Sequence, residues 1–310
     1  MEMLKTVRQA LHVPEIRSKL IFTLLMLVVF RIGSNIPVPG INRDVLAQVF
    51  AGDTGLFDLF DLFSGGSFSQ FTIFALSITP YITASIIIQL LTIAFPYFER
   101  LAKEGQEGRK KMAQITRYLT VVLALIQALG LTVGLFRQAV INQTWFSFTV
   151  IILVLTAGTA FLMWLGEKIN ENGIGNGISL IIFGGIVARI PSGLRSLYTQ
   201  FTEGTLGVIS LIIFALFAVV VILGVIEIQQ GTRRIPVQYA KRVVGRKMYG
   251  GQSTHIPLKV NQAGVIPVIF SLSILQFPLT ITYFFPNTGF TEFVTNWLSP
   301  AGMPGVLVYS

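Results

Sequence analysis

Seven long apolar runs, separated by short polar segments, pass through this 310-residue sequence. Each run is close to the roughly 20 residues that an α-helix needs to cross the hydrocarbon core of a bilayer. Only 12% of the residues are charged and the mean hydropathy is +0.71, whereas a soluble domain carries about 25% charged residues. The sequence therefore predicts an all-α polytopic membrane protein. The expected spans cover residues 18–38, 69–94, 118–136, 148–166, 173–190, 206–228 and 260–285.

Basic residues gather on one side of these spans. If the N-terminus is cytoplasmic, the cytoplasmic segments are 1–19, 95–117, 167–172 and 229–259, and they hold 18 of the 23 Lys and Arg residues. This asymmetry agrees with the positive-inside rule and predicts a multi-pass protein with a cytoplasmic N-terminus. The net charge of +9 is then a feature of membrane topology rather than a sign of nucleic-acid binding.

The first apolar run begins like a signal peptide, because Lys and Arg precede it. No small-residue cleavage site follows, so we expect it to be retained as the first span. Before it, Leu4, Val7 and Leu11 recur at helical spacing up to Pro14. This spacing predicts an amphipathic helix on the cytoplasmic membrane surface within residues 1–19.

The residue types present exclude several kinds of site. Without cysteine there is neither a disulfide nor a thiolate metal site, and His12 and His255 are too few and too far apart for a metal cluster. No P-loop, catalytic triad or carboxylate pair is evident, so we expect no enzyme activity, no cofactor and no metal. The span interiors almost lack ionisable residues. Arg31 and Arg189 lie near span ends, from which their side chains can extend to the interface.

The segment before the second span is short, apolar and acid-edged, and reads LFDLFDLFSGGSFSQ at 56–70. Asp53 or Thr54 can cap a helix here, and Gly65-Gly66 can end it. Taken alone, the pattern is typical of an amphipathic helix on the outer membrane surface. Its repeating phenylalanines and aspartates are Phe57, Phe60, Phe63, Asp58 and Asp61.

Three longer strings resemble the SecY family, the channel-forming subunits of the bacterial protein translocase. They read FALSITPYITASIIIQLL at 74–91, WLGEKINENGIGNGISLIIF at 164–183 and GTRRIPVQYAKRVVGRKMYGGQSTHIPLKVNQAGVIPVIF at 231–270. The resemblance implies ten spans in two inverted five-helix halves. Residues 20–190 would form the first half, including a plug at 56–68. Residues 191–310 would begin the second half, and we expect a truncated chain because an eighth span would start near its end.

Isoleucine pairs one helical turn apart occur in two of the expected spans. Ile78 and Ile82 share a face of the second, and Ile178 and Ile182 share a face of the fifth. By spacing alone such residues face lipid or pack against helices. The resemblance implies instead that these four, with Ile269 in the seventh span, form the apolar ring of a pore, which blocks ions by dewetting.

The resemblance also assigns a plug and a lateral gate. The plug, which would fold back beneath the ring and swing on a glycine hinge, comprises Phe57, Asp58, Phe60, Asp61, Phe63, Gly65 and Gly66. The lateral gate, a seam through which signal sequences and membrane segments leave sideways, includes Thr83, Gln89, Asn261, Ser273 and Phe277. The alternative role of the polar gate residues is structural, namely hydrogen bonding between neighbouring helices.

The loop 229–259 is strongly basic, and such loops often only set topology or touch anionic lipids. The resemblance implies that it docks a SecA-like motor ATPase or the ribosome through Arg233, Arg234, Lys241, Arg242, Arg246 and Lys247. Further implied partners are SecE-like and SecG-like small membrane subunits and a translocating polypeptide with its signal sequence. The implied function is the central pore of the Sec channel in the bacterial cytoplasmic membrane. The alternatives are a secondary transporter of small solutes and a membrane scaffold without a pore.

The glycine-rich string NGIGNGIS at 172–179 resembles a phosphate-binding loop. Phosphate-binding loops of that kind follow a β-strand within a βαβ unit, and no such unit is predicted here. We therefore expect a tight cytoplasmic turn that leads into the fifth span.

Overall fold

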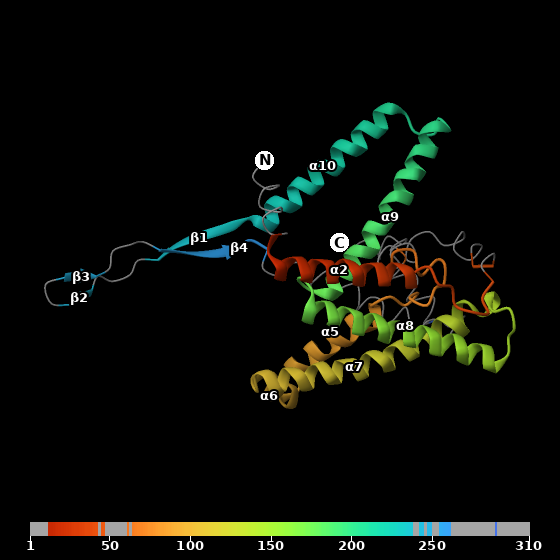
Figure 1. The fold of residues 1–310 in the computed structure, drawn as a ribbon, viewed down its shortest axis with the longest axis horizontal. Coiled ribbons are helices and arrows are strands. Elements are labelled where there is room, and N and C mark those ends of the chain that lie inside the picture. The colour runs from red at the N-terminus through yellow and green to blue at the C-terminus, as the bar shows by residue number, and fades with distance from the viewer. Residues whose placement is uncertain are drawn as a thin grey trace. The chain divides into compact units, whose positions relative to one another are not determined.

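The described part of the chain is mainly helical, with four short strands near one end (Figure 1). It divides into two compact units, Met1–Ser192 with Phe270–Ser310, and Gly193–Ile269. The predicted polytopic helical fold is confirmed. The computed structural model describes residues 12–42, 45–46, 61, 64–237, 242–244, 247–249, 254–261 and 289.

Four of the described helices are long and apolar enough to span a membrane, or five if a pair bent by 102° counts as one span. The pair consists of α5 (Thr79–Ala94) and α6 (Pro96–Lys103). The predicted seventh span, 260–285, lies almost wholly outside the described residues. The four long helices are α7 (Gln106–Leu129) with its π-helical end η1 (Gly130–Leu135), α8 (Trp145–Asn172), α9 (Gly177–Thr202) and α10 (Val208–Gln230).

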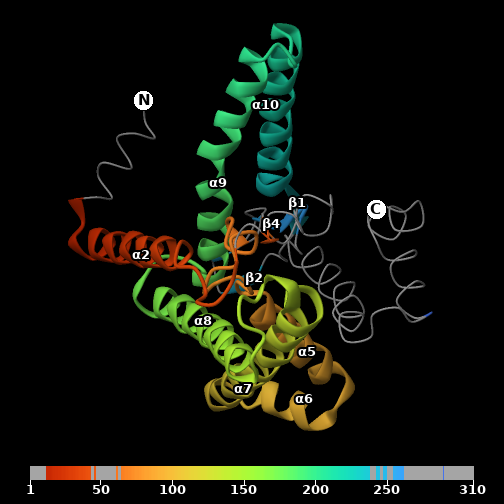
Figure 2. The same cartoon turned by 90° about the vertical axis from the view of Figure 1, so that its right-hand side faces the viewer.

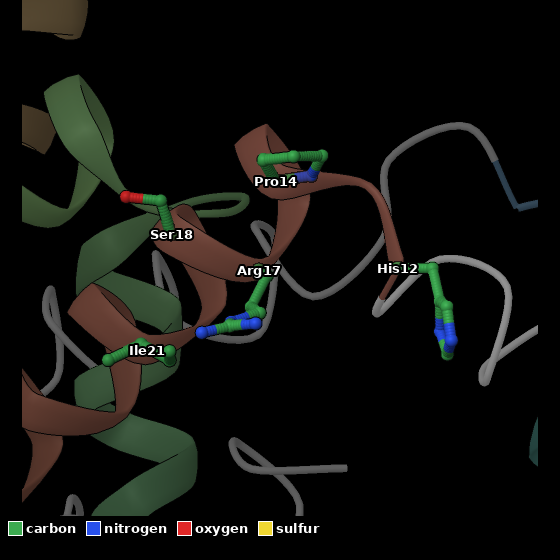
Figure 3. A pocket seen from close by; sticks show the side chains of 5 residues that line it. All are labelled: His12, Pro14, Arg17, Ser18 and Ile21. Carbon is green, nitrogen blue, oxygen red and sulfur yellow. The ribbon is translucent and has the colours of Figure 1, made fainter.

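The predicted first span, 18–38, overlaps α2 (Pro14–Gly33), which is 20 residues long but is not among the helices that meet both the length and the apolar composition of a span. Proline suits the first turn of α2 because the first amide groups of a helix lack intrahelical partners. The side chains of Arg17 and Ile21 line a hollow of about 600 Å³ beside this end of the helix (Figure 3). The predicted surface helix before Pro14 falls mostly on residues 1–11, which lie outside the described residues.

In the first unit, α7 packs against both α5 and α8, and α2 packs against α8 (Figures 1 and 2). Two apolar clusters fill the space between them. The first includes Phe68, Phe71 and Phe136, with the rings of Phe71 and Phe136 edge to face at 4.9 Å. The second joins α2, α5, α8 and α9. In it the ring of Phe74 stacks between Phe30 of α2 and Phe161 of α8.

The predicted second span, 69–94, is helical only from Thr79 onward. Residues 65–78 form consecutive turns, and positive φ angles of 46° at Phe71 and 52° at Ser77 are incompatible with a continuous right-handed helix. Pro80 in the first turn favours a helix start at that point. Most of the turn segment is buried. The Val38 amide donates a hydrogen bond to the Phe71 carbonyl at 3.1 Å, and the Ile73 amide donates one to the Ile36 carbonyl at 3.0 Å.

The turn predicted at NGIGNGIS is present between α8 and α9. The Asn170 side chain accepts a hydrogen bond from the Gly177 amide at 2.7 Å, and Thr23 Oγ1 of α2 accepts one from the Ile174 amide at 3.2 Å. A Cβ atom on Gly177 would lie 2.1 Å from the Gly166 carbonyl oxygen. The glycine content therefore reflects close backbone packing rather than phosphate binding.

The second unit contains α10 and an antiparallel arm of strands. None of the α10 residues is buried, as expected of a helix whose backbone bonds are internal and whose side chains suit lipid. β1 (Thr232–Val237) pairs with β4 (Thr254–Lys259), and β2 (Arg242–Val244) pairs with β3 (Lys247–Tyr249) farther along the arm (Figure 1). Within its described residues, the loop predicted at 229–259 thus contains two antiparallel strand pairs, which we call the ribbon.

Candidate pore and plug site

The four described isoleucines of the predicted ring come together in the second apolar cluster. Ile78 immediately precedes α5 and is 1% exposed, while Ile82, one turn later, is half-buried. Ile178 and Ile182, one turn apart on α9, are half-buried as well. The fifth predicted member, Ile269, lies outside the described residues.

The immediate surroundings of these isoleucines are apolar. The buried members of the cluster are aliphatic or aromatic side chains from α2, α8, α9 and the turn segment, such as Leu162, Leu165 and Ile181. The described members of this cluster carry no charge and no metal ligand, so the cluster can restrict a passage by its shape and its poor wetting.

The described end of the predicted plug segment is a helix terminus. Asp61 and Ser64 are helical, Gly65 has a φ of 68°, and the Gly66 amide donates a 3.0 Å hydrogen bond to the Asp61 carbonyl. A glycine in the left-handed conformation, followed by an amide that donates a 6→1 hydrogen bond to a carbonyl five residues earlier, is the Schellman motif. The prediction that Gly65-Gly66 ends a helix is confirmed. Phe57, Asp58, Phe60 and Phe63 lie outside the described residues.

The Asp61 carboxylate is buried and has several partners. Its Oδ1 accepts hydrogen bonds from the Ser69 amide at 2.8 Å and from the Ser64 hydroxyl at 3.4 Å. Its Oδ2 pairs with the Arg189 guanidinium of α9. The side chain of Asp61 is only 4% exposed, so it does not form the solvent-facing polar edge that its spacing suggests.

Arginines from two helices meet this terminus. Besides Arg189, Arg31 near the end of α2 donates a 3.3 Å hydrogen bond to the Gly65 carbonyl. Sequence reasoning assigned both arginines to the membrane interface and missed this role. The available signal was a pair of aspartates, Asp58 and Asp61, in an apolar segment ahead of a glycine pair, together with two isolated arginines at span ends.

The described members of the predicted lateral gate are Thr83, Gln89 and Asn261. Thr83 is buried, and its hydroxyl donates to the Thr79 carbonyl of its own helix at 3.1 Å, which is a common way to satisfy threonine inside a helix. Gln89 is exposed and Asn261 is half-buried. Ser273 and Phe277 lie outside the described residues.

The basic ribbon carries the predicted docking residues along its length. Arg233 and Arg234 are exposed on β1. Arg242 begins β2 and Lys247 begins β3, and only their backbones are described. Lys241 and Arg246 lie outside the described residues. Among the described residues, the structure contains no group of three or more His, Cys, Asp and Glu side chains that could hold a metal ion.

A family model for SecY matches residues 72–310. The chain belongs to the SecY family. Its curated relatives include the protein translocase subunit SecY of Halalkalibacterium halodurans, which is 52% identical over 292 residues, spanning 91% of this chain and 67% of the relative. The SecY subunit of Bacillus subtilis is 48% identical over 317 residues, spanning 99% of this chain and 73% of the relative. The predicted family resemblance is confirmed.

Solved structures support the SecY fold. A protein-conducting channel superposes with a TM-score of 0.67 at 22% identity, covering 94% of this chain and 68% of that chain. Sec61 in a canine ribosome-channel complex from the endoplasmic reticulum superposes with a TM-score of 0.65 at 21% identity, covering 94% and 69%. This SecY-family chain is therefore a multi-pass membrane protein, and its described helices agree with spans of the ten-span fold.

Proposed function

We propose that this SecY-family chain forms the pore of a Sec protein translocase, which passes unfolded secretory polypeptides across the bacterial cytoplasmic membrane and releases membrane segments sideways into it. The relatives at 52% and 48% identity are named protein translocase subunit SecY. The geometric observation that carries the proposal is the meeting of two isoleucine pairs, from α5 and α9, in one apolar cluster beside a buried, non-helical segment.

An apolar constriction suits this task on physical grounds. Ions and water enter narrow apolar passages poorly, so the constriction resists leakage without any charged gate. Aliphatic side chains also have no fixed hydrogen-bonding pattern, so they can fit closely around polypeptides of many sequences. We assign the ring to Ile78, Ile82, Ile178, Ile182 and Ile269, and the plug to residues 56–68.

The chain is proposed to act without chemistry of its own, so a partner supplies the driving force. The exposed Arg233 and Arg234 of the ribbon suit pairing with carboxylates of a SecA-like motor or with phosphates of the ribosome. We further propose SecE-like and SecG-like small subunits as neighbours, and a cytoplasmic N-terminus on the basis of the basic-residue asymmetry.

The apolar hollow beside α2 and α8 argues against a solute transporter. It has a volume of about 520 Å³ and is lined only by apolar residues, such as Ile32, Phe74 and Phe161. Binding a polar or charged solute in a membrane requires dipoles or charges at the site. Among the described residues that line this hollow, none supplies a charge.

Crosslinking tests the proposed path. We would place a photoreactive amino acid at Ile82 in the translocase and stall a secretory precursor during transport. We expect a covalent adduct between precursor and position 82, because the polypeptide must pass the ring. The same probe at Phe183, which is 58% exposed on α9, is the matched control and should give little adduct. Failure of position 82 to react with a precursor that is demonstrably stalled would overturn the proposal.

A further inference from the structure

The contacts around Asp61 reach beyond a helix end. The carboxylate joins three parts of the first unit, since Oδ2 pairs with Arg189 of α9 and Oδ1 accepts from the Ser69 amide in the turn segment. Arg31 of α2 holds the neighbouring Gly65 carbonyl. Two helices that are far apart in sequence, α2 and α9, thus contact the same helix terminus through Arg31 and Arg189.

Backbone packing adds a second restraint at the same place. A Cβ atom on Gly65 would lie 2.8 Å from the Cα atom and 3.0 Å from the carbonyl oxygen of Gly185 in α9. Only glycine allows such an approach, and the φ of 68° at Gly65 also favours glycine. Gly185 itself is buried, so α9 and the plug terminus pack backbone to backbone.

The chain beyond the terminus is embedded in the core. Phe68 and Phe71 are 5% and 1% exposed and belong to the first apolar cluster. The Thr72 amide donates a 3.0 Å hydrogen bond to the Ser67 carbonyl. Because the chain beyond Gly66 is fixed in the core, a swing of the preceding segment would have to break the Asp61–Arg189 ion pair, the hydrogen bond from the Ser69 amide and the close approach of Gly65 to Gly185.

We propose that Asp61 with Arg189, assisted by Arg31 at the Gly65 carbonyl, anchors the C-terminal end of the plug segment to the first and fifth spans, and that this anchor stays closed while a polypeptide passes. The inference rests on the proposed channel function. Arg189 and Arg31 are positioning residues in this scheme, and Gly65-Gly66 is a point of attachment rather than a hinge.

The physical reason for a lasting anchor is the burial of the carboxylate. A buried charge is strongly destabilised when its partner is removed, because little water is available to replace the lost contacts. The 35% exposure of the Arg189 side chain leaves the pair accessible to solvent from the arginine side only. Opening the channel by breaking this contact would therefore leave the buried Asp61 carboxylate without the counter-charge of Arg189.

Thiol labelling tests the anchor without requiring transport. Ser67 is 0% exposed and its hydroxyl has no hydrogen-bond partner among the described residues, so Ser67→Cys is a conservative probe in a chain that has no cysteine. We expect a water-soluble maleimide to label it slowly. Adding Arg189→Gln should raise the labelling rate on the order of tenfold, because the unpaired carboxylate frees the buried terminus. Adding Arg195→Gln, an exposed arginine on the same helix, should leave the rate unchanged.

A tether tests whether the anchor stays closed in the working translocase. In Asp61→Cys/Arg189→Cys, we expect a raised resting ion conductance that a short bifunctional thiol reagent returns to the parent level. Transport of a secretory precursor should stay within about twofold of the parent after tethering, since a covalent link replaces a contact that need not open. A monofunctional reagent of the same chemistry is the control and should not restore the seal.

Three results would overturn the proposal. The first is equal labelling of Ser67→Cys with and without Arg189. The second is a resting conductance that does not rise in the double cysteine variant, and the third is a tether that seals the channel but stops transport. The labelling result does not depend on the crosslink at position 82. Failure of the channel assignment and failure of the anchor proposal can therefore be distinguished.

Discussion

At the scale of single residues, neighbouring isoleucines have different surroundings. Ile78 is 1% exposed, whereas Ile82, Ile178 and Ile182 remain half-buried. Removing a fully buried side chain mainly leaves a cavity and lowers stability. Truncating a half-buried side chain that lines a passage mainly widens the passage. The three half-buried isoleucines are therefore the clean test of the ring.

We predict that the combined replacement Ile82→Ala, Ile178→Ala and Ile182→Ala raises the resting ion conductance of the translocase on the order of tenfold, since a wider apolar constriction wets more readily. Alanine keeps the helical propensity of α5 and α9 high. The measurement is single-channel recording in planar bilayers without precursor.

Two controls accompany the ring prediction. Phe183→Ala removes a large side chain from an exposed position on α9 and should not alter the conductance. Replacement of the same three isoleucines by leucine retains side-chain volume and should leave the seal intact. Conductance that stays at the parent level in the triple alanine variant would remove these residues from the ring.

At the scale of elements, a glycine of α8 determines how closely the helix approaches the non-helical turn segment. A Cβ atom on Gly158 would lie 1.9 Å from the Ile73 carbonyl oxygen. The obstacle is backbone, so no change of side-chain rotamer relieves it. Close approach through small residues is a general device for packing inside membranes, and here it seats the segment that leads into α5.

We predict that Gly158→Ala destabilises the protein by about 1–3 kcal/mol, the usual cost of overpacking a well-filled core. The measurement is thermal unfolding of the purified protein in detergent. Gly224→Ala is the matched control, because Gly224 lies within α10 and a Cβ atom there meets nothing within 4 Å. Equal melting temperatures for the two variants would show that α8 and the turn segment separate readily.

At the scale of the whole molecule, the basic residues are concentrated in a few segments between the apolar runs. The ribbon of β1–β4 and the segment 95–117 hold many of the basic residues. We propose that both segments face the cytoplasm. The described part of the ribbon consists of antiparallel strand pairs, whereas the segment 95–117 lies mainly in α6 and the start of α7 (Figure 1). An effect on partner docking can therefore be distinguished from an effect on membrane topology by reversing the same number of charges in the ribbon and in the segment 95–117.

We predict that Arg242→Glu/Arg246→Glu lowers motor-driven export roughly tenfold without changing membrane insertion, because reversed charges at an interface repel the partner. Arg109→Glu/Lys110→Glu, at two exposed positions of the segment 95–117, makes the same change in net charge and should leave export near the parent level. The measurement is precursor transport into inverted membrane vesicles. Normal export by the ribbon variant would show that this loop is not the docking site of the motor.

The sequence alone was sufficient for the class of fold and for the family. Apolar runs of bilayer length leave a helical membrane protein as the available solution, because every backbone group must be satisfied internally in lipid. The motifs at 74–91, 164–183 and 231–270 identified the family. The Schellman end at Gly65-Gly66 and the turn at 172–179 were also predictable, because both depend on local backbone chemistry.

Only the tertiary structure decided what depends on distant residues. Periodicity could not show that the second span is non-helical before Thr79, since the turns there are stabilised by amides of residues 36–38 and by the close approach of Gly158. Periodicity also could not show that Asp61 is buried, because its ion-pair partner, Arg189, lies 128 residues later in the sequence. An aspartate in a short apolar segment is predicted to face the surface until the fold shows its counter-charge.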